Sequence, residues 1–272
     1  MADIMEKRQR GRPRGLGADA GAVKSLERAL HILSRVAESD GQSLSEIAAA
    51  TGLPAPTVYR MLVSLEGFHM VEFDQPAQLW SVGVGAYRLG AAFLRRRKLV
   101  DRARLAMQDL ARDTGETANL GVAEDDSVVF VSQVETHQAI RAFFRPGQRT
   151  PFHASGIGKA MLAHFPPDRI AHVVGQGALE TFTAKTLSSA QSLTADLDEI
   201  RKRGWSLDDE ERYPGMRCIA AAIFNEHGEP LGGISVSGPT MRLTPERVAD
   251  IAAHVCRAAA NVTEMIGGQP PG

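Results

Sequence analysis

The chain has 272 residues, of which 43% are hydrophobic and 23% charged, a composition typical of a globular protein with two modest domains. No apolar run approaches the roughly 20 residues of a membrane span, and the basic opening lacks the apolar core of a signal peptide. Cys218 and Cys256 are too few and too far apart for a disulfide framework or a CxxC site. We therefore expect a cytoplasmic protein.

The net charge of −1 hides an asymmetry along the chain. Up to Lys98 there are 14 lysines and arginines against 10 acidic residues, whereas the remainder has 17 against 22. The basic residues of the first part gather near the start of the chain and again over residues 95–98. A basic segment beside a small folded unit is typical of proteins that bind the DNA phosphate backbone, although such runs also serve simply to keep a tail solvated.

Residues 1–22 contain four glycines and almost no large apolar side chain, which predicts a disordered basic arm. Its Arg10-Gly11-Arg12-Pro13 sequence, followed by Arg14, is slim enough for the narrow minor groove of A·T-rich DNA. The arm therefore offers Arg10, Arg12 and Arg14 as DNA contacts.

Three helices are predicted next. The first ends near Asp40-Gly41 and is indicated by the helical spacing of Val23, Leu26, Leu30, Leu33 and Val36. The second is short, begins at a capping box formed by Ser43 and Glu46, and ends at Thr51-Gly52. The third covers Leu53–Leu65, with one apolar face made by Val58, Met61, Leu62 and Leu65. A short helix, a glycine turn and a second amphipathic helix predict a helix-turn-helix.

Two alternating runs follow the third helix, Met70–Phe73 and Leu79–Val82, and they predict a hairpin that would be the wing of a winged helix. The DNA-binding domain is thus expected over residues 23–84. Residues 85–115 read as a linker helix divided by the basic run.

A second domain is predicted over residues 116–267, followed by a tail at 268–272. Strands are expected at Thr117–Ala123, Ser127–Gln133, Ala139–Phe144, Cys218–Phe224 and Leu231–Val236. Helices are expected at Ser155–His164, Pro166–Val174, Leu193–Arg203 and Thr244–Met265. One layer of strands with flanking helices predicts an α+β ligand-binding domain.

The third helix is the predicted DNA-reading element, because a helix-turn-helix places the N-terminal end of its second helix in the major groove. Its outward residues Pro56, Thr57, Tyr59 and Arg60 are the expected contacts, together with Ser45 at the start of the second helix. The guanidinium of Arg60 suits guanine, whose O6 and N7 it can bind together. An outward arginine on a helix is otherwise simply solvated.

With these segments assembled, the chain resembles the isocitrate lyase regulator (IclR) family of bacterial transcription factors from Val23 to Gly267. The resemblance is carried by residues 24–30, 44–65, 151–160 and 208–225, and above all by the spacing of Gly204, Asp208, Glu211, Cys218-Ile219-Ala220 and Ile223-Phe224-Asn225. It implies a winged helix-turn-helix joined by a linker helix to a GAF-like α/β effector-binding domain. It also implies a homodimer that assembles to a tetramer and near-palindromic half-sites in double-stranded promoter DNA.

A small anion is the expected ligand of the second domain. Ser155-Gly156-Ile157 opens a helix, whose free amides and positive dipole end suit a carboxylate, although Ser155 could be only an N-cap. Ser235 and Ser237 lie two apart on a strand and so share one face, which could equally be solvent-exposed. Taken alone, Cys218 reads as a small buried hydrophobe.

Within the family, the chain looks most like the glyoxylate-responsive regulators of allantoin and glyoxylate utilisation. This likeness implies a pocket lined by Ser155, Gly156, Ile157, Asp208, Cys218, Ser235 and Ser237. It predicts a regulator of glyoxylate and glycolate metabolism genes whose promoter binding is modulated by a small 2-oxo acid, with glyoxylate as the effector and without any cofactor. The alternative is a family member that responds to another small carboxylate as its effector.

Two other classes of protein fit less well. An enzyme would need a base with a nucleophile or a metal cluster, and no HxxH or HExxH spacing occurs among the eight histidines, so no catalytic or metal site is predicted. A ligand-independent architectural DNA binder would leave about 150 residues of the second domain without a role.

Overall fold

The computed structural model describes residues 23–96, 99–175 and 179–271. The chain divides into two compact units, residues 1–95 and 96–272. The predicted basic arm, with Arg10, Arg12 and Arg14, lies outside the described residues.

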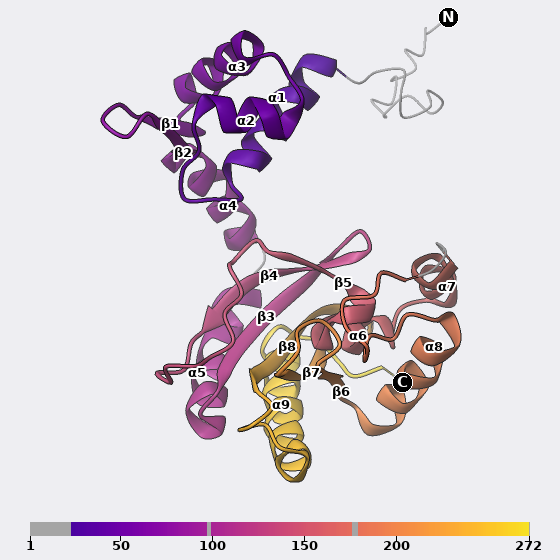
Figure 1. Ribbon diagram of the computed structural model, residues 1–272. Helices are drawn as coiled ribbons and strands as arrows, with labels where there is room; N and C mark the ends of the chain where they lie inside the picture. The colour runs from indigo at the N-terminus through magenta and orange to yellow at the C-terminus, as the bar shows by residue number, and fades with distance from the viewer. Residues whose placement is uncertain (1–22, 97–98, 176–178, 272) are drawn as a thin grey trace, which may run out of the picture. The chain divides into compact units, whose positions relative to one another are not determined.

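The first unit is a winged helix (Figure 1). Its elements are α1 (Lys24–Val36), α2 (Leu44–Thr51), α3 (Ala55–Gly67), β1 (Val71–Asp74), β2 (Leu79–Val82) and α4 (Val84–Arg96). The β1–β2 hairpin is the predicted wing, and a backbone bridge between Gln42 and Trp80 ties the segment before α2 to it. The core joins the three helices to the hairpin through Ile32, Val36, Ile47, Val58, Leu62, Val71 and Trp80.

Local signals place the helix-turn-helix as predicted. The Ser43 hydroxyl accepts a hydrogen bond from the amide of Glu46, whose carboxylate accepts one from the amide of Ser43. Gly52 ends α2 at a φ of +66°, a left-handed conformation that glycine adopts without a steric penalty. Val58 and Leu62 of α3 are fully buried.

Only part of the predicted apolar pattern of α1 is buried. Ile32 and Val36 point into the core, whereas Val23, Leu26 and Leu30 are more than half exposed. Their helical spacing therefore marks a second apolar stripe on the outside of the unit.

The second unit contains one six-stranded sheet with the order β5-β4-β3-β8-β7-β6, in which every neighbouring pair is antiparallel. The strands are β3 (Thr117–Glu124), β4 (Ser127–Val134), β5 (Arg149–Pro151), β6 (Ser206–Asp209), β7 (Met216–Phe224) and β8 (Pro230–Pro239). The helices are α5 (Leu99–Thr114), the 3₁₀ turn η1 (Phe152–Ala154), α6 (Gly156–Leu162), α7 (Pro167–Gly175), α8 (Ala190–Arg203) and α9 (Pro245–Met265).

Helices α5 and α9 lie side by side against one face of this sheet (Figure 1). The apolar core on that face joins Met107 of α5 and Ile251 of α9 to Leu120, Ile219 and Ile234 of the sheet. Helix α6 packs on the opposite face, where a smaller apolar cluster links it to α7 and α8.

Three expectations differ from the structure. The expected linker helix at residues 85–115 is covered by α4 and α5, with residues 97–98 between them outside the described ranges, and α5 belongs to the core of the second unit through Leu99, Ala103 and Met107. Residues 139–144 form no strand, and their hydrogen bond to the sheet comes from the Thr117 hydroxyl, which donates to the Ala142 carbonyl. The short strands β5 and β6 were not predicted.

Candidate functional site

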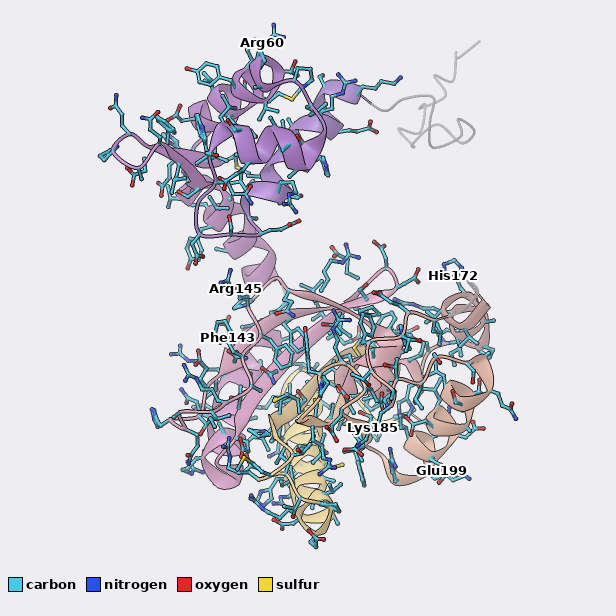
Figure 2. All side chains as sticks on the ribbon, in the orientation of Figure 1. Arg60, Phe143, Arg145, His172, Lys185 and Glu199 are labelled. Carbon is cyan, nitrogen blue, oxygen red and sulfur yellow. The ribbon has the colours of Figure 1, made fainter. Side chains whose placement is uncertain are left out.

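The predicted DNA-reading residues lie at the outer surface of the helix-turn-helix. Pro56, Tyr59 and Arg60 of α3 are exposed, Thr57 is half-buried, and Ser45 is exposed in the first turn of α2. Figure 2 shows Arg60 pointing away from the body of the first unit. Among the residues that the structure describes, none forms an ion pair with Arg60, so its guanidinium is free to bind a phosphate or a base edge.

The predicted effector residues come together on the α6 face of the six-stranded sheet. The register aligns Asp208 with Cys218, Cys218 with Ser237, and Ser237 with Thr117 across four neighbouring strands. Because side chains alternate between the two faces of a strand, residues that pair in register share a face. A second row, two residues along, contains Ser206, Ala220, Ser235 and Asn119. We call Thr117, Asn119, Asp208, Cys218, Ser235 and Ser237 the polar face.

Hydrogen bonds within the polar face satisfy most of its groups. The Asn119 amide donates to the Ser237 hydroxyl at 3.1 Å, and the amide of Gln133 on β4 donates to Asn119 Oδ1 at 2.8 Å. Ser235 is the exception, since it is fully buried and its hydroxyl forms no hydrogen bond with a nitrogen or oxygen atom of the described residues. It lies against the Cys218 thiol, a weak hydrogen-bonding group, and so remains able to bind a ligand.

The N-terminal end of α6 lies directly over Cys218. A Cβ atom at Gly156 would stand 2.8 Å from Cys218 Sγ, so only glycine permits this close approach of helix and sheet. The Ser155 hydroxyl accepts a hydrogen bond from the amide of Gly158, which makes Ser155 the N-cap of α6. Ile157 is buried against Gly121 and Gly233 of the sheet. Ser155, Gly156 and Ile157 thus lie beside the polar face.

Burial governs the protonation of the two titratable members of the polar face. It raises the pKa of the Asp208 carboxyl to about 6, although the backbone amides of Glu211 and Arg212 and the charge of Lys159 act in the opposite direction. Burial likewise raises the pKa of the Cys218 thiol to about 11. Cys218 is therefore a neutral thiol near pH 7, which excludes a role as a nucleophilic thiolate.

A buried ion cluster fixes the segment that follows Asp208. The ammonium group of Lys159 on α6 is fully buried and donates to Asp196 at 2.8 Å, to Glu211 at 2.6 Å and to the Leu207 carbonyl at 2.7 Å. Burial disfavours the charge on Lys159, but the carboxylates of Glu211 and Asp196 outweigh that effect and raise its pKa. Burial raises the pKa of Glu211 to about 7, against the opposing charge of Lys159.

The sequence did not indicate several of these residues. Thr117 and Asn119 fall within an apolar run, where only their alternation with Ala118 and Leu120 marks them as facing the other side. Lys159 forms its contacts with partners 37 and 52 residues away, and no local pattern predicts such pairs.

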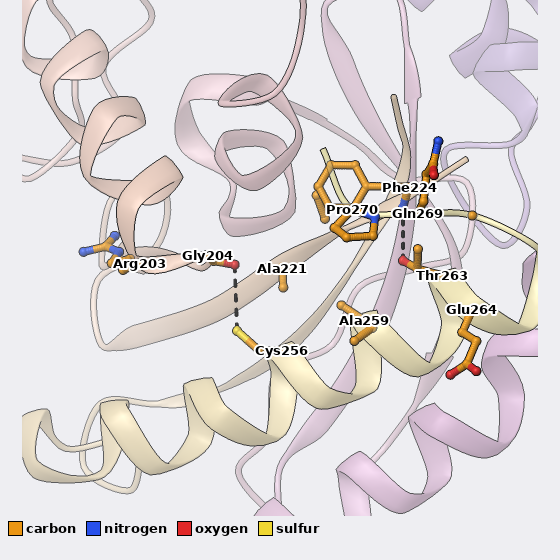
Figure 3. A pocket seen from close by; sticks show the side chains of 13 residues that line it. Arg203, Gly204, Ala221, Phe224, Cys256, Ala259, Thr263, Glu264, Gln269 and Pro270 are labelled. Atoms are coloured by element: carbon orange, nitrogen blue, oxygen red, sulfur yellow. Dashed lines mark hydrogen bonds between the residues drawn. The ribbon is translucent and has the colours of Figure 1, made fainter. Parts of the chain in front are cut away.

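A separate cavity of about 580 Å³ lies on the α9 side of β7 (Figure 3). Its lining includes Ala221 of β7, Cys256 and Thr263 of α9, and the chain end at Gln269 and Pro270. None of the predicted effector residues lines this cavity.

Comparisons with known proteins agree with this architecture. The family model described as "IclR helix-turn-helix domain" matches residues 25–75, and the model "Bacterial transcriptional regulator IclR C-terminal" matches residues 91–264. The HTH-type transcriptional regulator BhcR of Paracoccus denitrificans is 50% identical over 257 residues, which cover 93% of this chain and 92% of that protein. The transcriptional repressor IclR of Escherichia coli is 37% identical over 271 residues, or 98% of this chain and 99% of that one.

The solved structures include that of Thermotoga maritima IclR, which has a TM-score of 0.74 and 27% identity and covers 90% of this chain and 99% of that chain. The chain therefore belongs to the IclR family of bacterial transcriptional regulators. It is a DNA-binding transcriptional regulator rather than an enzyme. Within the described ranges, no helix is long and apolar enough to cross a membrane.

The raised pKa of Glu211 predicts a pH-dependent stability. Because its folded pKa of about 7 exceeds the ordinary 4.5, the folded chain binds the extra proton, and this contribution is fully present below pH 4.5 and is lost as the pH rises through 7. In Glu211→Gln, the free energy of unfolding should fall less between pH 5 and pH 8 than in the parent, by about 3 kcal/mol. Denaturant titrations across this range measure the difference.

The neighbouring Glu210→Gln variant is the control. Hydrogen bonds from Lys185 and the Gly215 amide lower the pKa of Glu210, so its contribution is constant above pH 5. An identical pH slope for Glu211→Gln and Glu210→Gln would contradict the assignment.

Proposed function

We propose that this regulator binds a small 2-oxo acid, glyoxylate, on the polar face of its second unit, and that this binding modulates its affinity for promoter DNA. The genes that it controls would then serve glyoxylate and glycolate metabolism. One observation carries the proposal: four strands present Asp208, Cys218, Ser237 and Thr117 in a single row beneath the start of α6, beside the buried hydroxyl of Ser235.

The composition of the polar face favours a small, strongly hydrated ligand over an aromatic one. Its members are hydroxyls, an amide, a thiol and a carboxyl, and none is an aromatic side chain that could stack on a ring. Neighbouring strands are only about 4.8 Å apart, so a molecule of a few heavy atoms can reach hydroxyls from two strands at once.

The two serines provide the direct test of the effector site. In Ser235→Ala/Ser237→Ala, two hydrogen-bonding groups are lost, and the affinity for glyoxylate measured by calorimetry should fall about 10- to 100-fold. The apparent effect of glyoxylate on promoter binding should shift to higher concentrations by the same factor.

Thr263→Val is the matched control, because Thr263 also carries a buried hydroxyl but lines the cavity on the α9 side of the sheet. It should bind glyoxylate like the parent. If Thr263→Val abolished binding while the double serine variant kept it, the effector site would lie in that cavity instead.

On the DNA side, we propose that α3 enters the major groove, with Arg60 as a base or phosphate contact and with Ser45, Pro56, Thr57 and Tyr59 beside it. The basic arm would reach the minor groove through Arg10, Arg12 and Arg14. The exposure of Arg60 and its lack of an ion pair among the described residues support this assignment.

Arg60→Ala should weaken operator binding by about 1 to 3 kcal/mol, since it removes a charged donor at the end of the recognition helix. Fluorescence anisotropy over a series of salt concentrations distinguishes the two kinds of contact. Loss of a phosphate contact reduces the slope of log affinity against log salt by about one, whereas loss of a base contact relaxes sequence specificity. Arg35→Ala, which removes an arginine that already pairs with Glu38, is the control and should leave affinity unchanged. Equal affinities for both variants would refute the role of Arg60.

We further propose that the regulator is a dimer through its first unit and a tetramer as a dimer of dimers. The exposed stripe formed by Val23, just before α1, and by Leu26 and Leu30 of α1 supports the dimer, as do the exposed Val84 and Tyr87 of α4. Contiguous exposed apolar side chains of this kind mark interaction surfaces. Two-fold symmetry would account for near-palindromic half-sites.

Leu26→Asp/Leu30→Asp should therefore reduce the size of the assembly in sedimentation velocity, because each substitution places a charge in an apolar interface. His31→Asp adds a charge at an exposed position of α1 outside the stripe and should leave the assembly intact. A double variant that sediments like the parent would rule out this surface as an interface.

A further inference from the structure

Among the predicted effector residues, only the amides at the start of α6 offer positive charge to a carboxylate on the polar face, and that charge is partial. Hydroxyls, an amide and a neutral thiol carry no charge, and Asp208 would repel an anion when ionised. Charge-assisted hydrogen bonds from arginine or lysine are the usual solution in proteins. The carboxylate therefore requires a nearby cation whose hydrogen-bond donors are not already bound to other acceptors.

Three nearby basic groups already have hydrogen-bond partners or are neutral. The ammonium of Lys159 donates to three acceptors and has no donor left. The guanidinium of Arg217, which lies on the opposite face of β7 from Cys218, binds Asp209 and the Leu243 carbonyl. Burial lowers the pKa of His153, so its imidazole is neutral near pH 7, and its Nε2 lies 2.9 Å from the Glu180 carbonyl oxygen.

Arg212 differs from these three groups because its guanidinium has donors that are not bound. Its Nε and Nη1 atoms are buried, and neither has a hydrogen-bond partner among the residues that the structure describes. The guanidinium is held in place by aromatic contacts instead, with Cζ at 4.0 Å from the centre of the Phe182 ring and at 5.5 Å from that of Tyr213. Buried guanidinium donors without an acceptor are costly, so an anion that accepted a hydrogen bond from Arg212 would gain a strong interaction.

The position of Arg212 beside the polar face also suits it to bind a ligand there. It directly follows Glu211, whose backbone amide donates to Asp208 Oδ1 at 2.8 Å, so the turn that carries Arg212 is hydrogen-bonded to the polar face. Lys159 anchors the same turn through the Glu211 carboxylate. On the other side, Phe182 stacks against His153, two residues before the start of the α6 cap. Arg212 thus lies in a wall built from the segments that surround the polar face.

We propose that Arg212 binds the carboxylate of the effector through its buried guanidinium, while the polar face binds the oxo or hydrated end of the molecule. This inference rests on the proposed effector function and adds to it the residue that selects an anion. Nε and Nη1 point to opposite sides of the guanidinium, so the carboxylate accepts a charge-assisted hydrogen bond from one of these two open donors.

The test compares glyoxylate with its neutral methyl ester by calorimetry on the full-length chain. For Arg212→Gln, the affinity for glyoxylate should fall about 10- to 100-fold, whereas the affinity for methyl glyoxylate should stay within about threefold of the parent. Arg212→Lys keeps the charge without the planar guanidinium and should bind glyoxylate with intermediate affinity; this variant also provides the test if Arg212→Gln does not fold. Lys185→Gln removes an exposed positive charge next to Asp209 and Glu210 and should bind glyoxylate like the parent.

The outcomes separate the inference from the function on which it rests. If Arg212→Gln binds glyoxylate like the parent while the Ser235→Ala/Ser237→Ala variant does not, Arg212 is not the carboxylate partner and the effector site stands. An equal loss of affinity for the acid and the ester would also overturn the inference, because it would show a general disruption of the site. If the parent binds neither glyoxylate nor pyruvate, both the inference and the proposed effector class are wrong.

Discussion

The alternation of side chains along β3, β7 and β8 is the constraint on which the second unit depends. Ala118, Ile219 and Val236 face α5 and α9 and form the main core, while their immediate neighbours Cys218 and Ser237 face α6. A shift of one residue in any of these strands would exchange the two sets and bury polar groups in the apolar core. The packing that stabilises the unit therefore also fixes the positions of the polar face.

Buried polar groups of this kind contribute little to stability unless they are satisfied, and in this unit most of them are. The cluster around Lys159 pairs its buried ammonium with two carboxylates and a carbonyl, which offsets the cost of removing the charge from water. The same cluster holds the turn between β6 and β7 against α6. Among the described residues of this unit, buried atoms without a hydrogen-bond partner are Thr150 Oγ1, Glu211 Oε2, Ser235 Oγ and the Nε and Nη1 atoms of Arg212. A ligand that bound to Ser235 and Arg212 would couple α6 to this turn.

The sequence predicted the first unit well because its signals are local. A capping box, the glycine after α2 and a helical apolar face each act within a few residues, and the structure has all three. The close approach of Ser235 and Ser237 was likewise predictable from a spacing of two on one strand. Both are almost completely buried, so the alternative of a solvent-exposed pair is wrong.

The rest could not be predicted because it depends on contacts between distant parts of the chain. The register that aligns Asp208 with Cys218 and Cys218 with Ser237 is set by the packing of whole strands. The mistaken strand at residues 139–144 had a suitable pattern, but Ile140 and Phe143 remain exposed and only the Ala142 carbonyl is bonded to the sheet. The open donors of Arg212 become visible only when all of its neighbours are placed.

The central claim, that the polar face and not the cavity beside α9 senses the effector, can be tested most directly by hydrogen exchange followed by mass spectrometry. The full-length chain would be compared with and without saturating glyoxylate. The account predicts slower exchange in peptides that cover residues 155–160, 206–218 and 233–238. Protection confined to α9 and to residues 266–271, or no protection anywhere in the second unit, would contradict it.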